Sequence, residues 1–398
     1  MLKLGENEKQ SSKDNGLDIE NNEDLYFKEN SKLFYRPVLT AVPNSNIIKL
    51  YFLEKNDLND NEDEGNDENE EKNNNLNRLH VLTKQFNFGK SEKQTFNSNF
   101  RTCQYHNQLM ITGGHDFYNQ DSKDCFIYNY RTNECKTLQM NTARSFHSSF
   151  YLTSLHVLIQ VSGIFNKKCE FLDVEKNIWQ NFSDVNVWRK DASIIVFQEK
   201  FLFIFGGWNC ELRQSNNNCN FIEKIEKIKI NKNYFDNTKR HEMKEINVIK
   251  QNENLFDGKW DMVNLEIMNE SIIFDDILRK SSIGVISLGD SKFLLLGGES
   301  SEFIEDSFIN NLSPGIGAVT KNTHSLVLDL RIKSYGDWEI MVKESFLTKE
   351  VCFSFNKQFI KIIKGNRLIY ANIDDTEQRF CKIEIKKDGS LEDRYYNL

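Results

Sequence analysis

Three arginines stand at comparable places along the chain and have the chemistry to bind carboxylates. They are Arg144 in "MNTARSFHSSF", Arg189 in "VWRKDASIIVF" and Arg279 in "ILRKSSIGVIS". They precede the next glycine pair, or its Ser-Gly equivalent, by 18, 17 and 18 residues. A guanidinium group offers planar, paired N–H donors that match a carboxylate. The nearly equal offsets predict that the three arginines occupy equal positions in successive copies of one structural unit.

The other residues capable of chemistry show no such regularity. The seven histidines have no common spacing, and we expect His115 and His147 to be structural residues of a loop and a strand. The eight cysteines are scattered without a CxxC spacing, which predicts reduced thiols and no metal site. The sequence contains no GxSxG, HExxH or GxxxxGK[ST] pattern. We therefore expect no enzyme activity, no cofactor and no small-molecule substrate.

The composition is that of a chain with a large core. Of its 398 residues, 39% are hydrophobic and 28% are charged. No apolar run approaches the roughly 18–20 residues that cross a bilayer, and the first residues lack the apolar segment of a secretion signal. The sequence therefore predicts an intracellular protein, cytoplasmic or associated with the cytoskeleton, without membrane insertion.

The formal net charge of −8 is concentrated in two segments. Residues 57–71 carry nine carboxylates and no Lys or Arg, and residues 1–32 carry eight acids against five lysines. Both segments are too polar to fold alone, so we expect a polar N-terminal segment at 1–32 and an inserted acidic loop at 57–71. The rest of the chain is slightly basic but shows no basic stripe with stacking aromatics, which argues against a nucleic-acid partner.

Paired glycines end three short apolar runs and reveal a repeat. The pairs are Gly113-Gly114, Gly206-Gly207 and Gly297-Gly298, with Ser162-Gly163 as a fourth copy that differs by one substitution. Short apolar runs indicate buried strands, and glycine allows a tight turn with positive φ. Each pair is followed by further short segments. The last of these opens with Trp179, Trp260 or Trp338 in three of the units, and Cys135 takes that place in the unit without a Trp. Four short strands per unit are the pattern of a propeller blade.

This pattern resembles the kelch-repeat β-propeller. In kelch blades the second strand ends in Gly-Gly, the third contains an aromatic residue and a Trp opens the fourth. The second glycines at 114, 163 and 207 lie 49 and 44 residues apart, near the kelch period of about 50. The resemblance covers residues 33–398 and implies an all-β, six-bladed propeller with degenerate terminal blades. A pair of packed β-sheets is the alternative fold.

Insertions explain the irregular spacings. The 91 residues between the glycines at 207 and 298 contain one candidate third strand, "FIEKIEKIKI", and one Trp-headed fourth strand, "KWDMVNLEI". This gap therefore predicts one blade with a polar loop at 231–258. The acidic segment falls between the second and third strands of the first blade. The run "FIKIIKG" is expected to be the second strand of the last blade. The later runs "RLIYANI", "RFCKIEI" and "EDRYYNL" are one strand more than this blade needs, and the extra one is expected to complete the first blade.

The resemblance implies two different roles for the arginines. In kelch proteins that capture peptides, arginines at this place line the pocket around the central channel, so Arg144, Arg189 and Arg279 would bind an acidic partner there. In many other kelch blades this arginine holds neighbouring loops together. The sequence does not decide between the two roles.

The resemblance also implies a class of function. We expect a non-enzymatic scaffold that binds other proteins through its propeller loops and channel mouth, as a subunit of a larger assembly such as the cytoskeleton. The alternative is a substrate-recognition subunit of a ubiquitin ligase, although residues 1–32 are too short for a BTB or F-box domain. A propeller enzyme of the copper radical type would need a His, Tyr and Cys cluster, for which the sequence shows no pattern. A fold by itself does not determine function.

Overall fold

The computed structural model describes the chain in segments. They are residues 38–53, 79–85, 95–116, 118–209, 225–231, 254–263, 265–267, 281–287, 291–301, 319–332, 338–351, 362–364, 367–373, 378–385 and 391–397. The chain divides into two compact units, residues 1–38 with 49–84 and residues 39–48 with 85–398. The described regular structure is β apart from one 3₁₀ turn, η2, at Thr153–Leu155. The predicted all-β class is confirmed.

Four of the sheets each contain four antiparallel strands that pair in chain order. The first sheet consists of β4 (Arg101–Tyr105), β5 (Gln108–Thr112), β6 (Asp124–Asn129) and β7 (Glu134–Gln139). The second consists of β8 (Ser148–Leu152), β9 (Val157–Val161), β10 (Cys169–Asp173) and β11 (Ile178–Phe182). The third consists of β12 (Ser193–Phe197), β13 (Phe201–Phe205), β14 (Ile225–Ile230) and β15 (Phe256–Val263). The fourth consists of β22 (Ile362–Lys364), β23 (Arg367–Ile373), β24 (Gln378–Ile385) and β25 (Leu391–Asn397).

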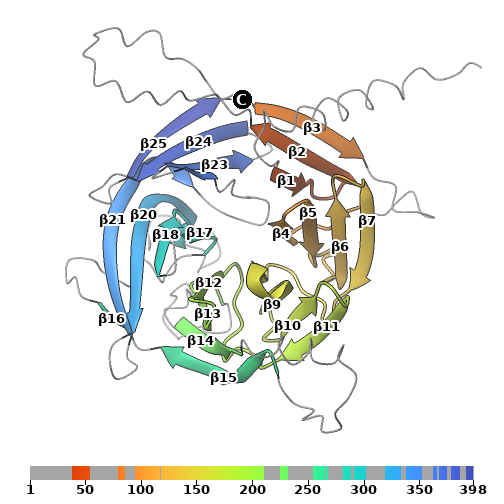
Figure 1. Ribbon diagram of the computed structural model, residues 1–398, viewed down its shortest axis with the longest axis horizontal. Helices are drawn as coiled ribbons and strands as arrows, with labels where there is room; N and C mark the ends of the chain where they lie inside the picture. The colour runs from red at the N-terminus through yellow and green to blue at the C-terminus, as the bar shows by residue number, and fades with distance from the viewer. Residues whose placement is uncertain are drawn as a thin grey trace, which may run out of the picture. The chain divides into compact units, whose positions relative to one another are not determined.

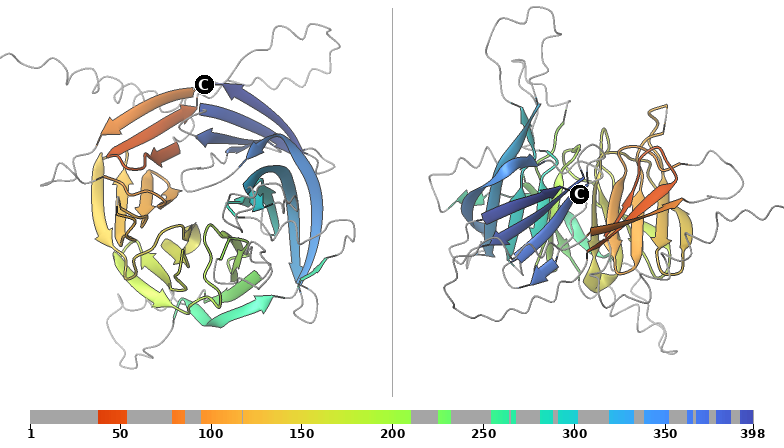
Figure 2. Two further views of the ribbon diagram at one scale, coloured as in Figure 1. Left: turned by 180° about the vertical axis from the view of Figure 1, so that it is seen from behind. Right: turned by 90° about the horizontal axis from the view of Figure 1, so that it is seen from above.

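Two further sheets depart from this pattern. One has the three strands β1 (Val38–Ala41), β2 (Ile47–Leu53) and β3 (Leu79–Gln85). The other has six strands: β17 (Gly284–Ser287), β18 (Lys292–Leu296), β19 (Glu299–Ser301), β20 (Val319–Ile332), β21 (Trp338–Val351) and β16 (Leu265–Ile267). Its long hairpin, β20 and β21, is drawn in blue in Figure 2. Strand β16 pairs in parallel with β21 and covers its outer edge.

Within the second unit the sheets follow one another around a common centre, with strands β4, β8, β12 and β17 innermost (Figure 1). The two middle strands of the β8–β11 sheet are buried throughout, at all five residues of β9 and all five of β10. Such burial is expected of strands that are covered on both faces. One core cluster joins Ile159 and Phe171 of the β8–β11 sheet to Ile204 and Ile228 of the β12–β15 sheet. Neighbouring sheets therefore pack face to face, as propeller blades do.

Several predicted elements are confirmed, and others need correction. Trp179 and Trp260 lie in the outer strands β11 and β15, and Trp338 opens β21. Strands β14 and β15 share one sheet, as expected for one blade with an insertion, but β15 begins at Phe256, inside the loop range 231–258.

The last sheet differs by one strand from the sequence-based prediction. Strand β22, within "FIKIIKG", is the first strand of its sheet and not the second, and β25, within "EDRYYNL", pairs with β24 in the same sheet. The three later runs, which contain β23, β24 and β25, therefore all belong to the last sheet, and none of them completes the β1–β3 sheet. The number of blades stays a prediction, and the acidic segment 57–71 lies outside the described residues.

The glycine turns have the predicted backbone. All seven glycines have positive φ, from +57° to +137°: Gly113, Gly114, Gly163, Gly206, Gly207, Gly297 and Gly298. At Gly207, where φ is +85°, a Cβ atom would lie 2.8 Å from the carbonyl oxygen of Lys190. The turn therefore needs glycine for its conformation and for its close approach to the chain segment before β12.

We predict that Gly207→Ala destabilises the fold more than Gly258→Ala. Gly258 also has positive φ, +79°, but a Cβ atom there would meet nothing within 4 Å. The control thus shares the backbone strain and lacks the clash. We expect Gly207→Ala to lower the free energy of unfolding by about 1–3 kcal/mol more than the control in denaturant melts. Equal losses would show that the close approach is not needed.

Candidate binding cavity

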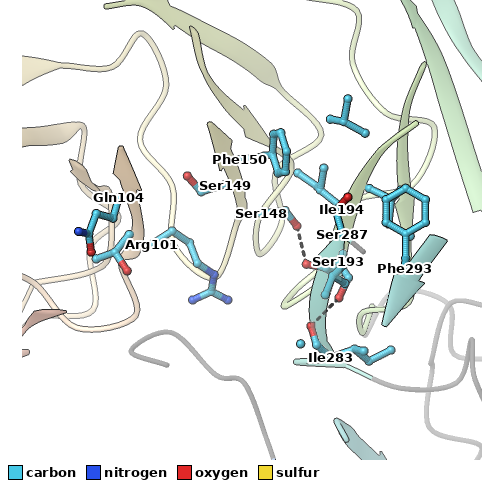
Figure 3. A pocket seen from close by; sticks show the side chains of 16 residues that line it. Arg101, Gln104, Ser148, Ser149, Phe150, Ser193, Ile194, Ile283, Ser287 and Phe293 are labelled. Carbon is cyan, nitrogen blue, oxygen red and sulfur yellow. Dashed lines mark hydrogen bonds between the residues drawn. The ribbon is translucent and has the colours of Figure 1, made fainter. Parts of the chain in front are cut away.

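A cavity of about 350 Å³ lies where the inner strands of four successive sheets meet. Its walls come from β4, β8, β12 and β17, with Phe293 of β18 and residues just before the strands (Figure 3). The lining combines hydroxyl and amide side chains with apolar ones. Among the described residues that line the cavity, Arg101 is the one with a charge.

A chain of turns positions the inner strands around this cavity. Each strand begins two residues after a residue with left-handed φ, between +51° and +55°: Asn99, Phe146, Asp191 and Ser282. The N–H of Phe146 donates to Asn99 O, that of Asp191 to Phe146 O, and that of Ser282 to Asp191 O, at 3.1, 2.9 and 2.9 Å. The four turns are therefore hydrogen-bonded in sequence from one sheet to the next.

Serine hydroxyls join the same strands a second time. Ser148 Oγ donates to the carbonyl of Ala192 at 2.8 Å, and Ser193 Oγ donates to the carbonyl of Ile283 at 3.0 Å. Both serines are the first residues of their strands, and both acceptors directly precede the next inner strand (Figure 3). Each hydroxyl donates its proton to a carbonyl of the neighbouring sheet. The two serines can therefore act toward the cavity only as hydrogen-bond acceptors.

Arg101 connects two sheets that are not consecutive. Its guanidinium points from β4 into the space between the inner strands (Figure 3), and Nη2 donates to the carboxylate of Asp191 in the turn before β12. Nη1 donates to Phe100 O at 3.1 Å. The side chains of Arg101 and Asp191 are 14% and 9% exposed. This partly desolvated ion pair was not predicted, since Arg101 stands 12 residues before Gly113 and lacks the offset of the other arginines.

Arg144 is completely buried and acts inside the fold. Its Nη2 donates to Glu170 Oε1 at 2.6 Å, and its Nη1 donates to the carbonyls of Ser162 and Lys168 at 3.0 and 2.9 Å. Glu170 is also fully buried and accepts a bond from the backbone N–H of Asn141 at 2.7 Å. The arginine thereby fastens the segment before β8 to the β9–β10 connection.

Arg189 repeats this arrangement one sheet later. It is fully buried, its Nη2 donates to Glu226 Oε1 at 2.9 Å, and its Nη1 donates to Gly206 O at 3.0 Å. Glu226 accepts a bond from the N–H of Asn186, which stands three residues before Arg189 as Asn141 does before Arg144. The pKa of Arg189 is lowered from its usual value because the side chain is buried, and the nearby carboxylate of Glu226 opposes this shift.

These positions correct the expectation that Arg144 and Arg189 line a pocket, because neither side chain has exposed surface. They hold loops together, which is the second role that the sequence left open. Arg279 lies outside the described residues, so its role stays a prediction. Arg144 and Arg189 each stand two residues before a residue with left-handed φ. In the third copy that residue is Ser282, so the equivalent position is Lys280 and not Arg279.

A buried polar network runs between the β4–β7 and β8–β11 sheets. His147 Nε2 lies 3.0 Å from Thr112 Oγ1, and Gln160 Nε2 donates to Ser149 Oγ at 2.9 Å on the cavity wall. Thr112 Oγ1 donates to Gln160 Oε1 at 3.4 Å and so joins the two ends. His147 is fully buried, as predicted for a structural histidine. Burial lowers the pKa of His147 well below its usual value.

The described residues bring no three His, Cys, Asp or Glu side chains together as metal ligands would be. In the same part of the chain, no helix is both long and apolar enough to cross a membrane.

We predict that removing the partner of a buried arginine is costly. Glu170→Gln leaves the cation of Arg144 without a counter-charge, which should lower the free energy of unfolding by about 3–5 kcal/mol. The matched control is Asp184→Asn, which breaks the pair with Lys168 between side chains that are 42% and 61% exposed. That change should cost about 1 kcal/mol or less in the same denaturant melts. Similar losses of unfolding free energy in both variants would contradict a special stabilising role of the ion pair between Arg144 and Glu170.

The buried His147 predicts acid sensitivity. Its pKa is lowered in the folded state, so below about pH 6.5 the unfolded chain binds a proton that the folded chain does not. Stability should therefore fall as the pH drops from 7 to 5, with a contribution of up to about 1.4 kcal/mol per pH unit from this residue. His147→Gln should show a shallower pH dependence of unfolding. An unchanged slope would show that another group causes it.

Comparison with known proteins agrees with this architecture. Residues 97–139, which contain the β4–β7 sheet, match the family model of the kelch motif. The solved structure of YjhT is similar with a TM-score of 0.50 and 11% sequence identity, and the match covers 91% of this chain and 97% of that chain. No curated protein matches the sequence. At this identity the likeness to YjhT concerns the fold alone. The chain thus carries a kelch motif at residues 97–139 and has the fold of a kelch-type β-propeller.

Proposed function

We propose that this propeller is a non-enzymatic scaffold that docks other proteins through its loops, as a subunit of a larger intracellular assembly such as the cytoskeleton. The observation that carries the proposal is the exposure of two large aromatic side chains. Tyr118 is 78% exposed and Phe165 is 66% exposed. Exposed aromatic residues are the side chains that most often anchor protein interfaces.

The two aromatics occupy equivalent connections. Tyr118 follows Gly113-Gly114 between β5 and β6, and Phe165 follows Ser162-Gly163 between β9 and β10. In the next sheet Trp208 directly follows Gly206-Gly207, with Lys190 Nζ 5.7 Å from its ring centre. Three successive loops thus contain an aromatic residue within four residues of the glycine turn.

The backbone at Phe165 supports a role beyond folding. Phe165 has a φ of +52°, a left-handed conformation that costs a non-glycine residue about 1–2 kcal/mol. Its ring touches that of Trp188, with centroids 5.0 Å apart, but keeps most of its surface in solvent. A bulky residue held in a costly conformation with its ring exposed is typical of a binding site.

The chemistry of the buried thiols and imidazole favours a non-enzymatic role. Burial raises the pKa of the Cys103 thiol, beside the cavity, to about 11, so little nucleophilic thiolate forms at neutral pH. His147, which belongs to the same polar network, is fully buried and has no surface from which to exchange protons with a bound substrate.

We predict that the aromatic loops carry partner binding in cells. The double variant Tyr118→Asn and Phe165→Asn removes both rings, and asparagine tolerates the left-handed backbone of residue 165. Crosslinking mass spectrometry of the tagged protein should recover the main partners at least about tenfold less than with the wild type. The matched control is Ile178→Asn, which removes a side chain that is 51% exposed on the outer strand β11.

The identity of the partners tests the remaining part of the proposal. Recovery of structural proteins, lost in the double variant and kept in the control, supports the scaffold role. A cullin-type ligase as the main partner would replace it with substrate recognition for ubiquitin transfer. Equal recovery of partners with all three proteins would overturn the assignment of the aromatic loops.

A further inference from the structure

The cavity at the inner strands contains a cation without a counter-charge in its own lining. Arg101 is the charged residue among the described residues of the wall, and its carboxylate partner, Asp191, stands in the turn above the wall. A partly desolvated guanidinium is stabilised by an anion that accepts two of its N–H bonds. We propose that the cavity binds a small organic carboxylate, whose carboxylate group takes the place of Asp191 on Arg101. This inference does not rest on the proposed scaffold role.

The position of Arg101 suits capture of a ligand better than a purely structural role. The buried Arg144 and Arg189 each donate to a glutamate of their own sheet and to backbone carbonyls. Arg101 instead reaches across the cavity to a different sheet, and its side chain keeps 14% of its surface exposed. A guanidinium that is reachable from the cavity and bound to one internal carboxylate can exchange that carboxylate for another of the same chemistry.

Asp191 acts in this scheme as an internal substitute for the ligand. It lies at a left-handed turn position that Asp and Asn tolerate better than other residues with side chains, and its backbone N–H and C=O are held by Phe146 and Ser282. These two backbone hydrogen bonds hold the turn independently of the ion pair between Asp191 and Arg101. Removing its charge should therefore free Arg101 without moving the turn.

The rest of the wall defines the body of the ligand. Ile195, Val285 and Phe293 contribute apolar surface from β12, β17 and β18, and Ser148 and Ser193 present hydroxyl oxygens near the start of their strands. A volume of about 350 Å³ is at the lower end of the range for small-molecule sites, about 300–1,000 Å³. The site therefore fits a compact molecule with one carboxylate and an apolar body, such as an aromatic or branched aliphatic acid.

The first test compares a carboxylate with its neutral isostere on the full-length protein. The probes are 4-fluorobenzoate and 4-fluorobenzamide, which differ chiefly in charge, and binding is measured from the broadening of their fluorine NMR signals. We expect 4-fluorobenzoate to bind at least about tenfold more tightly than 4-fluorobenzamide. Equal binding of the two probes, or no binding of either, would overturn the proposal.

The second test uses three variants with matched charge changes. Arg101→Gln should weaken 4-fluorobenzoate binding at least about tenfold, and Asp191→Asn should tighten it several-fold because the internal competitor is gone. Lys168→Gln removes an exposed cation outside the wall and should leave binding unchanged. Near-UV circular dichroism checks that each variant is folded. If Asp191→Asn binds no more tightly than the wild type, Asp191 is not a competitor and the proposal fails.

A third arm distinguishes a small molecule from an acidic protein segment. A synthetic peptide with the sequence of residues 57–71 is added to the protein bound to 4-fluorobenzoate. The proposal expects no displacement at equal concentration, because a chain of 15 residues is much larger than a cavity of about 350 Å³. If the peptide binds with dependence on Arg101 while 4-fluorobenzoate does not bind, the site takes acidic segments and the proposal is wrong.

Discussion

A buried guanidinium must find both a counter-charge and hydrogen-bond acceptors, and this requirement organises the middle of the fold. Arg144 and Arg189 have no exposed surface, so each depends on a glutamate and on carbonyls at the turn between the second and third strands. Any other placement of that turn would leave a charge unpaired in a low-dielectric interior, at a cost of several kcal/mol. The ion pairs therefore select one packing of each segment against its sheet.

The glycine turns are the second half of the same constraint. The N–H of Gly114 donates to the carbonyl of Arg144 at 2.9 Å, so the backbone of the arginine residue contacts the preceding sheet while its side chain binds the following one. At the neighbouring Gly113 a Cβ atom would collide with the same carbonyl of Arg144, so this close approach requires glycine. The glycine turn thus allows the backbones of two sheets to approach closely. The arginine side chain then holds the connecting segment in one position through its ion pair.

The inner strands can line a cavity because the sheets are joined to one another by contacts at the starts of these strands. Turn hydrogen bonds and serine hydroxyls connect neighbouring inner strands at their first residues. The side chains further along these strands do not need to hold the fold together across the centre. Arg101 can therefore face the cavity, and the exposed rings of Tyr118 and Phe165 can face solvent, without loss of the packed core between the sheets.

The sequence by itself determined the strand pattern, because alternation of short apolar runs with glycine turns and tryptophan-headed strands depends on local geometry. It also determined that Arg144 and Arg189 hold equivalent places. Only the tertiary structure decided what they do, since Glu170 and Glu226 lie 26 and 37 residues further along the chain and nothing local marks them as partners.

Arg101 and Asp191 lie 90 residues apart and meet through the packing of whole sheets. The last sheet shows the same division, since its strands were recognised from their composition but their order was misassigned by one. The pairing of a strand depends on which neighbour is in reach, and that is a property of the folded chain.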